Sequence, residues 1–379
     1  MSTPNQASSS GMGASRFSQN NFDLIRLVAA GEVAVRHAVH HIRPESESGP
    51  VFWLLDLIPG VPVFFFLSGF LISRSLERAS SLRDYFRNRA LRLYPALWTC
   101  TALSVLIVFA CGYMASSAWT PRGLGLWIAC QGTAFQFWNP EYFRGFGVGV
   151  VNGSLWSVSV EIQFYVAIVA TYGILRRLPP RLFDPGLAVL AVAFGLVAHN
   201  RSEIAQGLDL WSGSDLAGRL FRVSFVPWYY MFLLGVLAQR FHAILVPLLV
   251  DRVFAVIVVY FSSLLVEHFV WGLPVGNEIS SYLVPGMGCA VLAIAYSRPT
   301  LSHAILGRND VSYGVYIHHM PLVNLALWLG FAGSWVAILA VLLLTVGLAL
   351  VSWRVVEQPW LSRKRGAQRA FGTPSAAVT

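Results

Sequence analysis

The segment from Asn20 to His41, NNFDLIRLVAAGEVAVRHAVHH, has the apolar character of a membrane helix but also carries several ionisable side chains. Each such group costs about 3 kcal/mol within a bilayer unless it has a partner or faces a polar cavity. Side chains three or four residues apart on a helix can form ion pairs. Asp23 with Arg26 and Glu32 with Arg36 have that spacing, so ion pairs within the helix can explain these four charges. The histidines His37, His40 and His41 are not explained in this way.

His37 follows Arg26 by eleven residues. That spacing is about three helical turns and about 16 Å of rise, so both side chains lie on nearly the same face. A guanidinium group at the mouth and an imidazole deep inside would suit a channel that holds a long anionic molecule. The alternative is a histidine with a structural role only. A zinc site at His37 and His41 would lack the HExxH pattern and a clear third ligand, so we predict no metal.

The stretch DYFRNRALRLYPALW, residues 84–98, places Arg89 and Arg92 three residues apart on one helical face. The forked guanidinium group of arginine matches the geometry of phosphate. The pair could therefore clamp the phosphates of a nucleotide-type ligand. The alternative is a role in membrane topology with contacts to lipid phosphates.

The stretch NGSLWSVSVEIQFY, residues 152–165, places Glu161 about two turns into an apolar segment, with Ser157, Ser159 and Gln163 near it. A carboxylate within a membrane segment is a candidate functional group. Its alternative role is that of a buried partner for an arginine.

The stretch SYGVYIHHMPLV, residues 312–323, supplies two tyrosines and two histidines before a proline. The proline can kink a helix and free backbone polar groups for other contacts. Aromatic and histidine side chains also form simple belts at membrane surfaces. The polar residues of this stretch are Tyr313, Tyr316, His318 and His319, and the proline is Pro321.

Membrane helices must position these residues. The chain is 56% hydrophobic and 12% charged, with a mean hydropathy of +0.60, whereas soluble domains contain about 25% charged residues. A spanning helix needs about 20 apolar residues. We therefore predict an all-α integral membrane protein with about ten transmembrane helices around a central polar cavity. The predicted spans lie near residues 22–42, 51–74, 94–115, 154–175, 182–199, 220–239, 253–271, 279–297, 311–329 and 333–355.

The net charge of +9 comes mostly from arginines between the apolar segments, so membrane topology explains it better than nucleic-acid binding. With ten spans the arginine-rich connections fall on one side, which predicts that both termini are cytoplasmic. We interpret residues 123–138 as re-entrant or interfacial. A further span there would move the later arginine-rich loops to the opposite side of the membrane. We expect a disordered cytoplasmic tail at 1–20, one membrane domain at 21–360 and a basic cytoplasmic tail at 361–379.

The ordered motifs resemble the hallmarks of the family-three membrane acyltransferases. These motifs are NNFDLIRLVAA…RH, GVPVFFFLSGFLI, YFRNRALRLYPALW, NGSLWSVSVEIQFY, SYGVYIHHMP and VEQPW, and they run from Asn20 to Trp360. Members of that family are integral membrane enzymes that O-acylate surface polysaccharides and related glycans. The resemblance implies ten core helices, an acyl-coenzyme A donor that is reached from the cytoplasm and an acceptor on the outer side.

The resemblance also implies roles for individual residues. The family's arginine, ten residues, histidine pattern matches Arg26 and His37, and its paired arginines match Arg89 and Arg92. The glutamate of its LWSxxxE segment matches Glu161. We therefore expect His37 and Glu161 to be catalytic, with the histidine as general base, and the three arginines to bind coenzyme A. The expected substrate-binding residues are Trp156, Ser157, Tyr313, Tyr316 and His319.

The resemblance further implies that no cofactor is bound, and that acyl-coenzyme A, by family habit acetyl-coenzyme A, is a donor substrate. The expected partners are the glycan acceptor and membrane lipids, without nucleic acid. A homo-oligomer or partners from polysaccharide synthesis are open. The expected location is the inner or plasma membrane. Direct transfer and an acyl-histidine relay are both open mechanisms.

Two features depart from the family's pattern: His318 stands where Trp or Leu is common, and Glu32 and Arg36 add charge to the first helix. The main alternative function is a membrane transporter or flippase of a polysaccharide export system, in which the buried charges line a solute path. A second alternative is a structural partner in an export complex.

Overall fold

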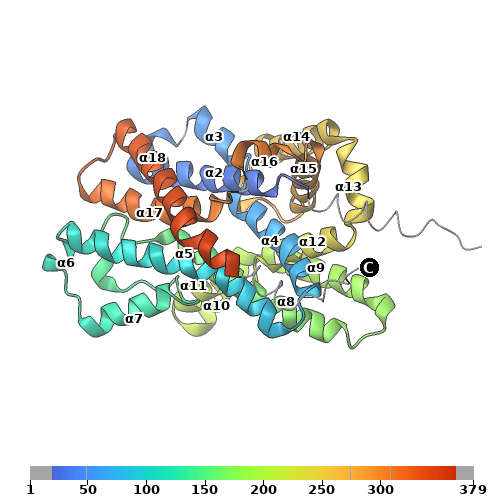
Figure 1. Ribbon diagram of the computed structural model, residues 1–379, viewed down its shortest axis with the longest axis horizontal. Helices are drawn as coiled ribbons and strands as arrows, with labels where there is room; N and C mark the ends of the chain where they lie inside the picture. The colour runs from blue at the N-terminus through green and yellow to red at the C-terminus, as the bar shows by residue number, and fades with distance from the viewer. Residues whose placement is uncertain (1–18, 48, 274, 308, 364–379) are drawn as a thin grey trace, which may run out of the picture.

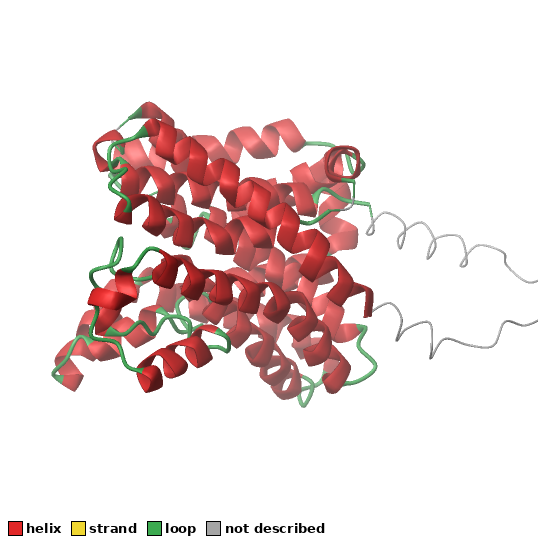
Figure 2. Ribbon diagram, turned by 60° about the vertical axis from the view of Figure 1, so that its left-hand side comes forward, coloured by secondary structure: helices red, strands yellow, loops and turns green. Residues whose placement is uncertain are grey.

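The computed structural model describes residues 19–363 except 48, 274 and 308. Within these residues the chain forms helices and loops and no strand (Figure 2). The predicted all-α fold is therefore confirmed. The tails predicted at 1–20 and 361–379 lie outside the described residues, apart from residues 19, 20 and 361–363.

Most of the described chain lies in helices (Figure 1). Figure 1 shows α13, α14 and α15 gathered at one end of the molecule and α6 and α7 at the other. Short turns join some of the helices, and a π-helical turn, η6 (Trp353–Glu357), extends the last one. The helices are α2 Phe22–Ile42, α3 Pro50–Asp56, α4 Gly60–Glu77, α5 Leu82–Ala110, α6 Tyr113–Ser116, α7 Pro121–Gln131, α8 Trp156–Leu175, α9 Phe183–His199, α10 Arg201–Ser212, α11 Leu216–Arg222, α12 Tyr229–Arg240, α13 His242–Val250, α14 Val253–Trp271, α15 Val284–Ser297, α16 Leu301–Leu306, α17 Ser312–Trp328 and α18 Trp335–Ser352.

Among the described residues, six helices are long and apolar enough to cross a membrane, or seven if α12 and α13 form one bent span. The chain is thus a helical membrane protein, but the predicted count of ten is not confirmed. The charges of α2 exclude it from that set, and α15 and α17 have only 14 and 17 residues. Each of the ten predicted segments nevertheless contains a helix.

Prolines account for the main differences from the predicted boundaries, because a proline disfavours the helical conformation of the residue before it. The predicted span 51–74 is divided into α3 and α4, with Pro59 between them. The predicted span 220–239 begins only at Tyr229, after Pro227. The sequence analysis missed α13, which bends from α12 by 89°.

Helix α2 packs against α4 and α17, and α17 also contacts α5 and α18. The packed face of α2 carries small residues, and Ala29, Ala30, Ala34 and Ala38 are all at most 1% exposed. Small side chains let helix backbones approach closely in a membrane. The alanine face of α2 is therefore held against neighbouring helices.

Helices α4 and α12 are in direct backbone contact at two glycines. A Cβ atom added to Gly69 would lie 1.9 Å from the carbonyl oxygen of Phe232, and one added to Gly235 would lie 2.0 Å from the carbonyl oxygen of Phe66. This contact leaves no room for a side chain, so it fixes α4 against α12. Ser68, next to Gly69, is thereby held in place.

The side chain of Asn324 on α17 binds the backbone of the connection 132–155. The Asn324 amide oxygen accepts a hydrogen bond from the backbone N–H of Val148 at 2.8 Å. Its amide nitrogen donates to the carbonyls of Val150 and Val151, both at 2.9 Å. Gly147 has a φ of +52°, and a Cβ atom there would lie 2.1 Å from the Asn324 oxygen. The connection therefore needs glycine at this point.

We predict that Gly69→Val lowers the free energy of unfolding by at least about 2 kcal/mol, because the added side chain must push α4 away from α12. Gly31→Ala is the control, since no atom lies within 4 Å of a Cβ atom built there. Denaturation of the purified protein in mixed micelles measures both variants. Equal stability of the two variants would contradict the close contact.

Candidate functional site

Helix α5 begins at a capped end and carries two arginines into a cavity. The Ser81 hydroxyl accepts a hydrogen bond from the backbone N–H of Asp84 at 3.1 Å, which satisfies one free donor of the first turn. Arg89 and Arg92 follow, one turn apart. They line a cavity of about 380 Å³ among α2, α4, α5 and α8, together with Arg26, Ser68, Arg74, Ser75, Arg78, Glu161 and Tyr165.

Arg26 and Arg92 meet on one carboxylate, that of Asp310. Arg26 Nη1 donates to Asp310 Oδ2 at 2.9 Å, and Arg92 Nη2 forms an ion pair with the same oxygen. Arg92 also lies 3.6 Å from Glu357. The ion pairs join α2, α5 and the loop before α17, three parts that are distant in sequence.

Asp310 was not among the site residues predicted from the sequence. Burial alone would raise the pKa of its carboxyl group, but Arg26, Arg92 and the hydrogen bonds from Ser312 lower that pKa to about 2. The carboxylate is therefore ionised at neutral pH and balances part of the charge of the cavity. The available signal was an acidic residue two positions before the SYGVY stretch, where it accepts a hydrogen bond from the Ser312 backbone N–H.

Glu161 lies where the arginine-lined cavity meets a second, inner cavity of about 40 Å³. Its Oε1 accepts hydrogen bonds from Ser68 Oγ at 3.0 Å and from Tyr165 OH at 2.9 Å. His37 is not among these hydrogen-bond partners of Glu161. His37 and Glu161, both expected to be catalytic, therefore have different hydrogen-bond partners.

The inner cavity shares Arg26, Ser68 and Glu161 with the arginine-lined cavity. Its inner wall includes Ser157, Tyr313 and Tyr316, three of the expected substrate-binding residues. The Ser157 and Tyr316 hydroxyl groups are hydrogen-bonded at 2.5 Å. A ligand with a charged head and a narrow tail could place its head among the arginines and its tail beside these hydroxyl groups.

His37 and His319 form a direct pair beyond the inner cavity. His37 Nδ1 and His319 Nε2 are 2.8 Å apart, which is a hydrogen bond. The ring of Tyr316 lies 6.1 Å from that of His319, centroid to centroid. Tyr316 thus connects the wall of the inner cavity to the histidine pair.

Two expected substrate-binding residues line neither cavity. Trp156 packs among other aromatic rings, 5.2 Å from Trp228 by ring centroids. His319 is 0% exposed. The ring of His41 lies next to that of His37 on the same helix, with centroids 6.0 Å apart. Within the described part of the chain, no group of three or more His, Cys, Asp or Glu side chains could hold a metal ion.

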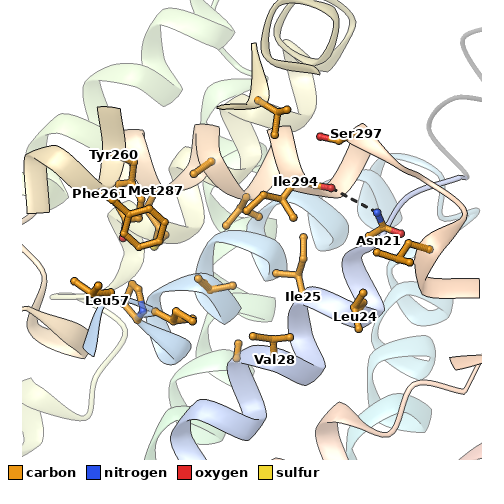
Figure 3. Close-up of a pocket in the computed structure, with 18 of the residues that line it drawn as sticks. Asn21, Leu24, Ile25, Val28, Leu57, Tyr260, Phe261, Met287, Ile294 and Ser297 are labelled. Carbon is orange, nitrogen blue, oxygen red and sulfur yellow. Dashed lines mark hydrogen bonds between the residues drawn. The ribbon is translucent and has the colours of Figure 1, made fainter. Parts of the chain in front are cut away.

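A separate groove of about 420 Å³ lies between α2, α14 and α15. Figure 3 shows that Ile25 and Val28 of α2 face Met287 and Ile294 of α15 across it. The Asn21 amide donates to the Ile294 carbonyl at 3.5 Å at one end. The walls are mainly apolar and contain none of the expected catalytic residues, so the candidate site is the arginine-lined cavity with its inner extension.

We predict that Asp310→Asn lowers the free energy of unfolding by about 3 kcal/mol, because removing one partner leaves two partly buried guanidinium groups without their shared anion. Asp215→Asn is the control, since Asp215 pairs with Arg219 on the exposed surface and such pairs contribute little. Unfolding curves of the purified variants in detergent would refute the prediction if both matched the unmodified protein.

Comparison with known proteins adds independent information. Residues 19–354 match the family described as acyltransferase domain. Nodulation protein 10 of Rhizobium leguminosarum bv. viciae is 30% identical over 90% of this chain and 93% of that protein. The O-acetyl transferase of Shigella phage Sf6 is 23% identical over 91% of this chain and 96% of that protein. The peptidoglycan O-acetyltransferase OatA of Listeria monocytogenes is 24% identical over 83% of this chain and 52% of that protein.

No solved structure matches the chain. The family match nevertheless covers the arginine-lined cavity, the inner cavity and the histidine pair. The match favours an enzyme over the transporter and the structural partner considered above. The chain is a membrane protein that belongs to this acyltransferase family and transfers acyl groups other than aminoacyl groups.

Proposed function

We propose that this enzyme moves an acyl group, specifically acetyl, from acyl-coenzyme A to a hydroxyl group of a cell-surface or exported polysaccharide or oligosaccharide. The names of the relatives support the transferred group and the acceptor class, because two are O-acetyl transferases and one of these is named for peptidoglycan. The proposed location is the inner or plasma membrane, with both termini in the cytoplasm.

The observation that carries this proposal is that the arginine-lined cavity joins the inner cavity at Arg26, Ser68 and Glu161, and that the inner cavity ends next to the histidine pair, which itself lines neither cavity. Five arginines line the arginine-lined cavity. The inner cavity ends at Tyr316, beside His319. Coenzyme A has a head of several phosphates and a narrow arm that ends in the thioester. Its charge distribution therefore matches the cavity, with the head at the arginines and the thioester toward the histidines.

In the proposed complex, Arg89 and its neighbours bind the coenzyme A phosphates. Arg89 Nη2 donates to Ser75 Oγ at 3.2 Å, and its Nε is buried with no hydrogen-bond partner among the described residues. Arg26 and Arg92 are already bound to Asp310 and contribute the remaining positive charge. Arg89 thus has donors left for a phosphate oxygen.

The proposed chemistry is direct transfer with His37 as general base. His37 Nε2 takes the proton of the acceptor hydroxyl group while the hydroxyl oxygen forms a bond to the thioester carbonyl carbon. The carbon–sulfur bond then breaks, and the leaving thiolate takes the same proton from His37. Ser157, Tyr313 and Tyr316 contact the acyl group in the inner cavity. Glu161 positions the thioester arm beside Ser68, and Trp156 stays outside the substrate contacts.

We predict that His37→Ala lowers acyl transfer at least about 100-fold, the usual contribution of a general base. Membranes with the full-length protein receive radiolabelled acetyl-coenzyme A, and the label in their glycans is counted. Gly31→Ala on the same helix is the control and should retain activity, because a methyl group there meets open space. Undiminished transfer by His37→Ala at equal protein levels would rule out the proposed base.

We predict that Arg89→Gln weakens acetyl-coenzyme A binding about 10-fold, because one charge-assisted hydrogen bond contributes about 1.5 kcal/mol. Arg87→Gln is the matched control, since Arg87 is exposed on the same helix and does not line the cavity. Calorimetric titration of the purified protein measures both dissociation constants. Equal affinities in the two variants would place the phosphates elsewhere.

A further inference from the structure

We propose that His319 is a positioning residue, which holds His37 in the tautomer whose Nε2 carries no proton. This inference rests on the proposed role of His37 as general base. It assigns to His319 a task different from the substrate contact that its sequence motif implied. The orienting partner of the base is then a second histidine and not Glu161.

The contact between the two rings is specific and comes from two helices. His37 stands on α2 and His319 on α17, and these helices pack against each other. The bonded nitrogens, His37 Nδ1 and His319 Nε2, are 2.8 Å apart. The ring planes are inclined by 30°, with centroids 5.1 Å apart. This geometry is that of a hydrogen bond between ring edges, not of stacked rings.

The direction of the hydrogen bond follows from the other nitrogen of His319. His319 Nδ1 lies 3.4 Å from the Val315 carbonyl oxygen, and a carbonyl can only accept. A neutral imidazole has one N–H donor and one acceptor nitrogen. The proton of His319 is therefore on Nδ1, and its Nε2 accepts from Nδ1–H of His37. The lone pair of a neutral His37 is then on Nε2, where a hydroxyl proton can be taken up.

His319 is itself held firmly. Its ring is 0% exposed and lies against Tyr316, whose hydroxyl group also donates to the Ser154 carbonyl at 3.2 Å. Asn324, further along α17, binds the 132–155 connection through three hydrogen bonds. A firmly held acceptor gives the base one ring orientation and one tautomer.

A neutral partner suits this location better than a carboxylate. In serine hydrolases an aspartate fixes the tautomer of the catalytic histidine. A carboxylate within a membrane helix would carry a desolvation cost, and the acidic groups of the site are already bound to arginines, serine or tyrosine. The acceptor nitrogen of an imidazole orients His37 and adds no charge.

The test compares three replacements of His319 in the full-length protein. The side-chain oxygen of glutamine stands as many bonds from Cα as Nε2 of histidine and can accept the His37 proton. The oxygen of asparagine is one bond shorter, and leucine has no acceptor. Acyl transfer to membrane glycans from radiolabelled acetyl-coenzyme A is measured for each variant, together with the acetyl-coenzyme A affinity of the purified protein.

We expect His319→Leu and His319→Asn to lower transfer at least about 100-fold, and His319→Gln to retain it within about 10-fold. Donor affinity should stay unchanged in all three, because His319 lines neither cavity. If His319→Gln is as inactive as His319→Asn while donor binding is normal, His319 carries a proton or contacts substrate and the inference is overturned. Full activity of His319→Leu overturns it as well.

The same assay separates this inference from the proposed function. Undiminished transfer by His37→Ala refutes the general base and with it the whole proposal. Loss of transfer in His37→Ala, with equal activities in the glutamine and asparagine variants of His319, refutes only the positioning role. If His319→Leu does not fold, the glutamine and asparagine pair decides the question alone.

Discussion

The carboxylate of Asp310 between the guanidinium groups of Arg26 and Arg92 is the interaction on which the site depends. Two guanidinium groups this close would repel each other without a shared anion. The ion pairs also set the depth of α17 relative to α2. His37 is eleven residues beyond Arg26 on α2, a rise of about 16 Å, and His319 is seven residues beyond Ser312, where α17 begins two residues after Asp310, a rise of about 10 Å. Because the ion pair joins α2 at Arg26 to the start of α17, His37 and His319 come to similar depths along the two helices.

The other polar groups of the site are also held by contacts between helices. Glu161 is held by Ser68 and Tyr165, and Ser68 is fixed because α4 and α12 touch at Gly69. Ser157 and Tyr316 bind each other at the wall of the inner cavity. Polar side chains in a membrane protein need partners within the protein. Here the partners come from separate helices, so the same contacts that satisfy these groups also hold the bundle together.

The sequence predicted which residues belong to the site better than it predicted which of them are in contact. The motif order anticipated that Arg26, Arg89, Arg92 and Glu161 would be close, and the structure brings them to one cavity. Sequence spacing describes neighbours on one helix, so it identified His37 and His319 but could not pair residues 282 positions apart. The predicted count of ten spans was not confirmed for a different reason, because α2 is too charged and α15 and α17 are too short to qualify as spans by length and composition.

The attachment of the 132–155 connection to Asn324 does not depend on the side chains at the attached positions. Only the backbone of the connection is bound by that side chain, and Gly147 is the position where a larger residue would collide. The exposed side chains of the connection, such as Glu141 and Arg144, can therefore diverge during evolution without disturbing α17, whereas Asn152, which donates to the Ile317 carbonyl at 2.8 Å, is constrained. A lineage could acquire a new surface over this end of the bundle by drift in one segment, while the buried histidines keep their arrangement.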